Sequence, residues 1–199
     1  MIDFLQPDMY ITEYCGATWT ILTTSQNGIP GEQATRTVRE GPDREGLLYA
    51  GTEFGMFISF DDGAHWQSLQ FDLPATPVTD IRVHRKDLIL STMGRSFWIM
   101  DDLTPLHQLH DQLAANEIHL FKPRDTFRMR WSQTISIDDG AAPEYPPFGA
   151  LIHYYLPEDT DGEIKMDILD ADHIAVLTYA SDSTDTDIRP AGMLRLPSK

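Results

Sequence analysis

The sequence predicts an all-β chain, and three observations carry that prediction. Short runs rich in β-branched and aromatic residues recur every eight to twelve residues. Glycine and proline, 13 of each, fall between these runs. Stretches of the first half repeat each other at offsets of 40 and 47 residues. Repeats of this length with about four strands each are typical of propeller blades, so we expect part of a β-propeller.

The expected strands follow in chain order. In the first hundred residues they are Thr37–Arg39, Leu47–Ala50, Met56–Ser59, Val78–His84, Leu88–Ser91 and Phe97–Met100. Near the end of the chain they are Ala150–Leu156, Glu163–Leu169 and Ala175–Tyr179. Alternation of Ile164, Met166 and Ile168 predicts one shared apolar face. We expect Pro157–Gly162 to be the loop of a hairpin, and His107–Glu117 to be the one helix.

One short motif has a structural meaning of its own, Ser59-x-Asp61-x-Gly63-x-x-Trp66. This is an Asp-box, the motif of bacterial neuraminidase (BNR) repeats. We expect Asp61 to accept backbone N–H groups across a hairpin turn, and Gly63 to supply a positive φ. Trp66 should begin the outer strand and cover the hairpin, so the box is structural and Asp61 is not a catalytic acid. A degenerate copy at Thr12–Trp19 has tyrosine at the acid position.

A second internal match has an offset of 40 residues. Leu48, Thr52, Phe57, Asp61 and Asp62 match Leu88, Thr92, Phe97, Asp101 and Asp102. Both offsets agree with the spacing of the expected strands. We therefore interpret the first 110 residues as the outer end of one blade and about two further blades.

The segments Gly46–Gly55, Ser59–Trp66 and Gly94–Leu106 together go beyond a generic Asp-box. They resemble the last blades of the large bacterial sortilin-like (VPS10-type) BNR-repeat propeller proteins, often labelled glycosyl hydrolases. The resemblance is good from Thr12 to Lys122, but Met93 stands where the family has histidine. It implies that the chain is the C-terminal piece of a longer protein, exported or periplasmic.

The resemblance also implies a domain organisation. Residues 1–122 would be C-terminal propeller blades, 123–149 a linker, and 150–199 the start of a fibronectin-like β-sandwich with a tail. In the family, the third sandwich strand follows an Asp-x-x-Gly turn. The corresponding residues here, Asp170-Ala-Asp-His173, lack the glycine.

Composition excludes several function classes. The chain has 31 acidic and 15 basic residues, so its net charge of −16 leaves no electrostatic footprint for nucleic acid. No apolar run is long enough to insert in a membrane. The single cysteine, Cys15, excludes an internal disulfide and a cysteine zinc cluster. No pattern predicts a metal site or a cofactor.

Four charged residues are candidates for a ligand site. Glu53, in a glycine-flanked turn, and Arg95, in the related position one blade on, would lie near the mouth of the propeller channel. The alternative is an ion pair between neighbouring blades. Asp101 and Asp102 follow the strand Phe97–Met100, either as turn acids or with one of them as half of a catalytic pair.

These observations leave two functions open, together with a third possibility, that the fragment has no activity of its own. The first is a binding or interaction scaffold for a peptide, protein or glycan. The second is a glycoside hydrolase whose carboxylates are shared with missing blades. Two blades cannot close a propeller, so we also expect self-association through uncovered apolar side chains such as Val38, Ile81 and Val83.

Overall fold

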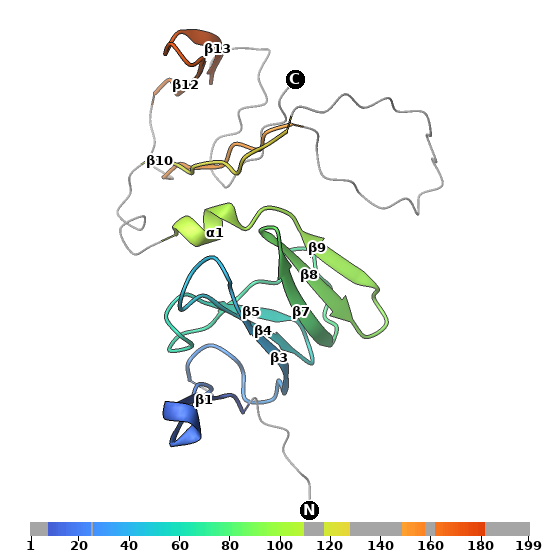
Figure 1. The fold of residues 1–199 in the computed structure, drawn as a ribbon. Helices are drawn as coiled ribbons and strands as arrows, with labels where there is room; N and C mark the ends of the chain where they lie inside the picture. The colour runs from blue at the N-terminus through green and yellow to red at the C-terminus, as the bar shows by residue number, and fades with distance from the viewer. Residues whose placement is uncertain (1–7, 25, 110–117, 128–148, 158–161, 182–199) are drawn as a thin grey trace, which may run out of the picture. The chain divides into compact units, whose positions relative to one another are not determined.

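The computed structural model describes residues 8–24, 26–109, 118–127, 149–157 and 162–181 (Figure 1). The chain divides into two compact units, Met1–Leu103 and Thr104–Lys199. The described part is mostly β, with small antiparallel sheets and one short α-helix. The expected all-β class is therefore confirmed at this coarse level.

The described residues of the first unit form three sheets. A hairpin of β1 (Tyr10–Glu13) and β2 (Thr18–Ile21) comes first, with the short 3-10 turn η1 (Tyr14–Gly16) between its strands. Four strands follow in the order β3 (Thr35–Glu40), β4 (Leu48–Thr52), β5 (Met56–Ser59) and β6 (Gln67–Ser68). The third sheet has the order β7 (Val78–His84), β8 (Asp87–Thr92) and β9 (Phe97–Met100). All six strands expected in this region are present.

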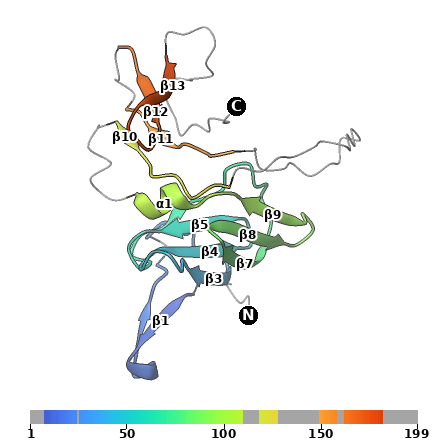
Figure 2. The same cartoon turned by 45° about the horizontal axis from the view of Figure 1, so that its top comes forward.

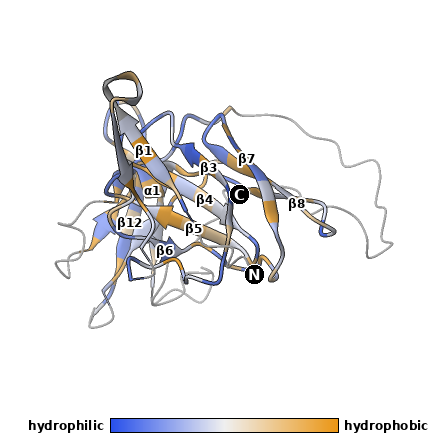
Figure 3. Cartoon of the chain, turned by 90° about the horizontal axis from the view of Figure 1, so that it is seen from below, coloured by the Kyte–Doolittle hydropathy of each residue, from blue (hydrophilic) through white to orange (hydrophobic). Residues whose placement is uncertain are grey.

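The core of the four-stranded sheet lies around β4 and β5, whose described residues are all buried. Figure 3 shows β5 as a strongly hydrophobic strand. One face packs a cluster of Met9, Ile29, Leu48, Ala50, Phe57 and Trp66, with Leu22 and Val38 against it. Residues before β3 therefore contribute to the core of this sheet.

Strand β7 runs beside β3 and β4, so the two larger sheets pack closely (Figure 2). A Cβ on Gly51 would lie 2.8 Å from Cγ2 of Thr37 and 2.8 Å from Cγ1 of Val78. Only glycine allows the backbone of β4 to approach β7 this closely. An ion pair of 2.6 Å between Arg39 and Asp80 also joins β3 to β7.

The two larger sheets repeat each other in pairing as well as in sequence. Ala50 lies opposite Phe57 in the first sheet, and Leu90 lies opposite Trp98 in the second. The turn before β9 is therefore one residue longer than its counterpart before β5. As a result the structure aligns Phe57 with Trp98, and not with Phe97 as the sequence offset indicated.

The expected exposure of Val38, Ile81 and Val83 is wrong for Ile81, which is fully buried, while the two valines are half-buried. Ile81 points to the covered face of its sheet, because β7 packs against the first sheet. The exposed apolar side chains of this unit include Trp19 and Ile21 on β2 and Phe97 and Ile99 on β9.

The second unit has smaller elements. They are α1 (Thr104–Gln108), a sheet of β10 (His119–Leu120) and β11 (Tyr154–Tyr155), and a hairpin of β12 (Lys165–Leu169) and β13 (Ala175–Ala180). The predicted helix start at His107 is wrong, because the helix begins at Thr104, where a proline fits the first turn. Residues 110–117 of that prediction lie outside the described residues.

Residues 158–161 of the expected loop Pro157–Gly162 lie outside the described residues, and the described strands on either side of it do not pair as a hairpin. Strand β11 pairs with β10, and β12 pairs with β13. The predicted apolar face of β12 is confirmed, since Ile164 and Met166 pack against buried Tyr154 and Leu156. The linker at 123–149 lies mostly outside the described residues, so it stays a prediction, as does the sandwich.

Candidate functional site

The Asp-box forms the turn between β5 and β6. The hydroxyl of Ser59 donates to Oδ1 of Asp61 at 2.8 Å and accepts the N–H of Gly63 at 2.9 Å. Asp61 Oδ1 also accepts the N–H of His65 at 2.8 Å. Gly63 has a φ of +87°, which a Cβ would penalise. Every one of these polar groups acts within the turn.

Trp66 anchors this turn to the chain before β3. Its side chain is 4% exposed, its backbone N–H donates to Asn27 O at 2.7 Å, and its indole Nε1 donates to Leu22 O at 3.4 Å. Trp19, the matching residue of the degenerate copy, is 65% exposed. Its indole donates only locally, to Gly16 O at 3.1 Å. The intact box therefore buries its tryptophan and the degenerate copy does not.

The Asp61 carboxylate is held in its charged form by the same turn. Burial raises its pKa, but hydrogen bonds from the ring and backbone of His65 and from Ser59 outweigh that effect. The pKa of Asp61 therefore lies below its usual value. The His65 ring lies 2.6 Å from Asp61 Oδ2. A carboxylate of low pKa is unsuited to general acid catalysis near neutral pH.

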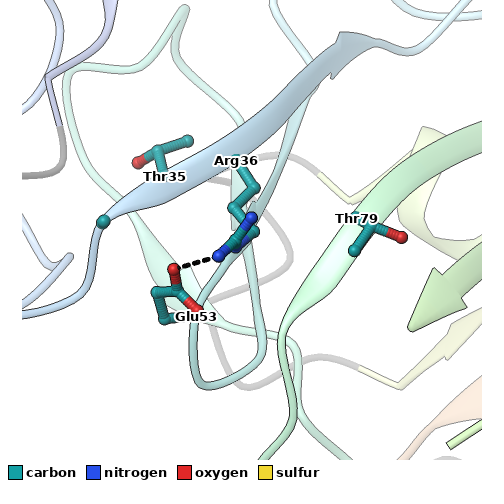
Figure 4. A pocket seen from close by; sticks show the side chains of 5 residues that line it. Thr35, Arg36, Glu53 and Thr79 are labelled. Carbon is teal, nitrogen blue, oxygen red and sulfur yellow. Dashed lines mark hydrogen bonds and ion pairs between the residues drawn. The ribbon is translucent and has the colours of Figure 1, made fainter. Parts of the chain in front are cut away.

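An open hollow of about 370 Å³ lies where the two larger sheets meet (Figure 4). It is lined by Ala34, Thr35, Arg36, Glu53 and Thr79. The Arg36 guanidinium and the Glu53 carboxylate form an ion pair of 2.5 Å within it. Both side chains keep part of their surface exposed, 38% for Arg36 and 25% for Glu53. The pair is therefore open to a ligand from solution.

Two equivalent β-bulges aim side chains at this hollow. The register of β3 with β4 shifts between Thr35 and Thr37, which leaves Arg36 without a cross-strand partner. The register of β7 with β8 shifts between Val78 and Asp80, which leaves Thr79 in the same position. Bulges of this kind re-aim a side chain and are common beside functional sites.

Glu53 is fixed by the turn between β4 and β5. Its backbone N–H donates to Ala34 O at 3.0 Å, and Thr52 closes the turn by donating its N–H to Gly55 O at 2.8 Å. The Thr35 hydroxyl is buried and has no hydrogen-bond partner among the described residues. The Thr79 hydroxyl contacts that of Ser91 at 2.8 Å. The hollow thus presents one cation and one anion, and the hydroxyl oxygens of Thr35 and Thr79 point away from this ion pair (Figure 4).

The other predicted site residues are placed elsewhere. Arg95 is exposed on the turn between β8 and β9, and Glu53 pairs with Arg36 rather than with Arg95. Asp101 and Asp102 follow the opposite end of β9, and Asp102 is 2% exposed. The four residues of β9 lie between the turn that holds Arg95 and the residue Asp101. At the usual rise per residue this strand spans about 13 Å. The structure therefore does not group these three charged residues into one site.

Sequence reasoning identified Glu53 but missed Arg36, Thr35 and Thr79. The only sign of Arg36 in the sequence is that a charged residue stands between the strand-forming residues Thr35 and Thr37. Nothing in the sequence alone indicated the bulge that turns it toward Glu53.

Comparison of the chain with protein-family models, with curated proteins and with solved structures found no match. In the part of the chain that the structure describes, no group of three or more His, Cys, Asp and Glu side chains is placed to hold a metal ion. No helix among the same residues is long and apolar enough to cross a membrane.

Proposed function

We propose that the sheets β3–β6 and β7–β9 are consecutive blades of a BNR-repeat propeller of the sortilin-like type, and that they form a binding scaffold. Support comes from the Asp-box hydrogen bonds, the repeated pairing pattern and the close packing at Gly51. In this proposal the hairpin β1–β2 is the outer pair of the preceding blade. Residues 150–199 begin the β-sandwich that follows.

The ligand site of this scaffold is the hollow around Arg36 and Glu53. The observation that carries this assignment is the pair of equivalent bulges at Arg36 and Thr79, which present different side chains to one space. An exposed guanidinium and carboxylate recognise polar, hydrogen-bonding ligands, such as a peptide, a protein loop or a glycan. No cofactor is part of this proposal.

Within the part of the chain that the structure describes, the carboxylates favour binding over glycoside hydrolysis. Of the residues that line the hollow, only Glu53 carries one. A glycosidase of the usual kind needs two, about 5 Å apart for retention or 6.5–9.5 Å apart for inversion. Asp61 braces a turn at the other end of β5, so it does not supply the second.

The test is a binding screen of the labelled full chain on arrays of peptides and glycans. We expect Arg36→Gln and Glu53→Gln each to lose the features that the wild-type chain binds. Arg82→Gln is the matched control, because Arg82 is an exposed arginine of β7 outside the hollow. If both hollow variants retain the wild-type pattern, the site assignment is wrong. Release of fluorophore from methylumbelliferyl glycosides, abolished by Glu53→Gln, would instead support the hydrolase.

A further inference from the structure

The Asp-box is tied to the chain before β3 by the side chain of Asn27. The amide nitrogen Nδ2 of Asn27 donates to Leu22 O at 2.6 Å and to Gly63 O at 3.2 Å. The side-chain oxygen Oδ1 accepts the N–H of Thr24 at 3.0 Å. Both polar atoms of this side chain therefore hold the box in place.

The residue that follows, Gly28, is required by space. It has a φ of +115°, and a Cβ there would overlap the backbone carbonyl group of Trp66. No other amino acid fits so close an approach of two backbones. Gly28 is also exposed, and its N–H donates to no described residue. The fold thus places an asparagine directly before an exposed glycine.

An asparagine in this position is chemically reactive, because glycine has no side chain to hinder attack by its backbone nitrogen. The nitrogen of Gly28 forms a bond to Cγ of Asn27, and the bond from Cγ to Nδ2 breaks. The proton of the attacking nitrogen passes through solvent to the departing amide group, which leaves as ammonia. The product is a cyclic succinimide. Water then adds to one of its two carbonyl carbons and breaks the bond from that carbon to nitrogen, which gives aspartate or isoaspartate.

We propose that Asn27 is a site of spontaneous deamidation, and that the reaction releases the Asp-box from the chain before β3. The leaving nitrogen is held by two carbonyl groups, so the reaction proceeds through local openings of these hydrogen bonds. The product has a carboxylate in place of the amide, and a carboxylate has no N–H for the carbonyl oxygens of Leu22 and Gly63. Refolding does not reverse the change, so it accumulates with the age of the chain.

The test incubates the full chain in mildly alkaline buffer and follows each asparagine by mass spectrometry after digestion with trypsin. The tryptic peptide that ends at Arg36 contains one asparagine, Asn27. We expect this peptide to gain the mass that separates water from ammonia, and to split into an aspartate and an isoaspartate form. Asn116, the other asparagine of the chain, is the internal control. It precedes Glu117, whose side chain hinders the attack, so it should react far more slowly.

Variants of the Asp-box test the requirement for local opening. Trp66→Ala and Ser59→Ala both weaken the box, and each should speed the deamidation of Asn27 at least about tenfold. Trp19→Ala is the matched control, because Trp19 is exposed in the degenerate copy, and it should leave the rate unchanged. Ser59→Ala keeps the large buried side chain and decides the point should circular dichroism show that Trp66→Ala is unfolded.

The consequence of the reaction is measured on the modified chain itself. Ion-exchange chromatography separates it by its added negative charge, and we expect it to unfold at a lower urea concentration than the unmodified chain. Asn27→Asp should reproduce this shift for the aspartate product. An Asn27 that stays intact, equal rates at Asn27 and Asn116, box variants that react at the wild-type rate, or a modified chain that unfolds like wild type would each overturn the proposal. Equal acceleration by Trp19→Ala and Trp66→Ala would do the same.

Discussion

The side-chain amide of Asn27 donates a hydrogen bond to the carbonyl oxygen of Gly63 at 3.2 Å, across 36 residues of sequence. The same side-chain amide donates to Leu22 O at 2.6 Å. The backbone carbonyl oxygen of Asn27 accepts the N–H of Trp66. One residue outside the Asp-box therefore ties both sides of the box to the chain that leads into β3.

We expect Asn27→Ala to lower the free energy of unfolding by about 1–3 kcal/mol, because carbonyl oxygens lose their donor in a half-buried setting. Urea unfolding followed by tryptophan fluorescence measures this. Asn27→Asp is the informative companion, since it keeps an acceptor for the N–H of Thr24 but removes the donor. Unfolding midpoints equal to wild type in both variants would contradict the assigned role.

The two tryptophans of the repeated box give a matched pair. Trp66→Ala should cost about 3–5 kcal/mol of stability, the range for a buried large aromatic side chain. Trp19→Ala should change the free energy of unfolding by no more than about 0.5 kcal/mol, because most of the Trp19 side chain is already exposed. Thermal or urea unfolding of both variants decides the point. Equal losses for the two variants would mean that the buried contacts of Trp66 do not stabilise the fold.

The strands of the first unit could be predicted because their signals are local. Runs such as Met56–Ser59 and Val78–His84 are β-rich, each directly follows a glycine or a proline, and the structure has strands with these same bounds. Exposure could not be predicted in the same way. Ile81 is buried by a neighbouring sheet whose position depends on the close approach at Gly51, a contact between strands distant in sequence.

The candidate site was predictable only in part for the same reason. Glu53 stands out in a glycine-flanked turn, so its position was visible in the sequence. Its partner Arg36 is 17 residues away and depends on a register shift that no composition rule predicts. The pairing of β11 with β10 was missed because it joins segments separated by more than 30 residues.

The Asp61 turn predicts a specific dependence on pH. Because the folded pKa of Asp61 lies below its unfolded value, its ionised form stabilises the fold. That stabilisation is present above the unfolded pKa, about 3.9, and is lost as the pH falls through the folded pKa. Asp61→Asn should therefore lower stability at neutral pH and flatten the acid limb of a plot of unfolding free energy against pH. The neighbouring variant Asp62→Asn is the control, and an acid limb identical in Asp61→Asn and wild type would contradict the prediction.

Gly51 tests the packing of the two sheets beside the hollow. Gly51→Ala places a methyl group 2.8–2.9 Å from atoms of Thr37 and Val78, so we expect a loss of about 1–3 kcal/mol from overpacking. Gly94→Ala is the contrasting variant, because a Cβ there meets nothing within 4 Å and only its positive φ is strained. Urea unfolding should rank Gly51→Ala as the more damaging change. The reverse order would mean that β3, β4 and β7 are not in tight contact.

The turn before β13 predicts a stabilising substitution. His173 has a φ of +61°, at the position where the family resemblance expects glycine. Asp170 Oδ1 accepts the N–H groups of Asp172 and Ile174, both at 2.9 Å, so the turn itself is well braced. His173→Gly should remove left-handed backbone strain of about 1–2 kcal/mol, offset in part by the greater freedom of glycine in the unfolded chain.

Amide exchange in β12 and β13, followed by NMR, should slow in His173→Gly. In Asp172→Gly, where φ is not positive, it should quicken. Faster exchange in His173→Gly would show that the histidine side chain contributes more than its backbone strain costs.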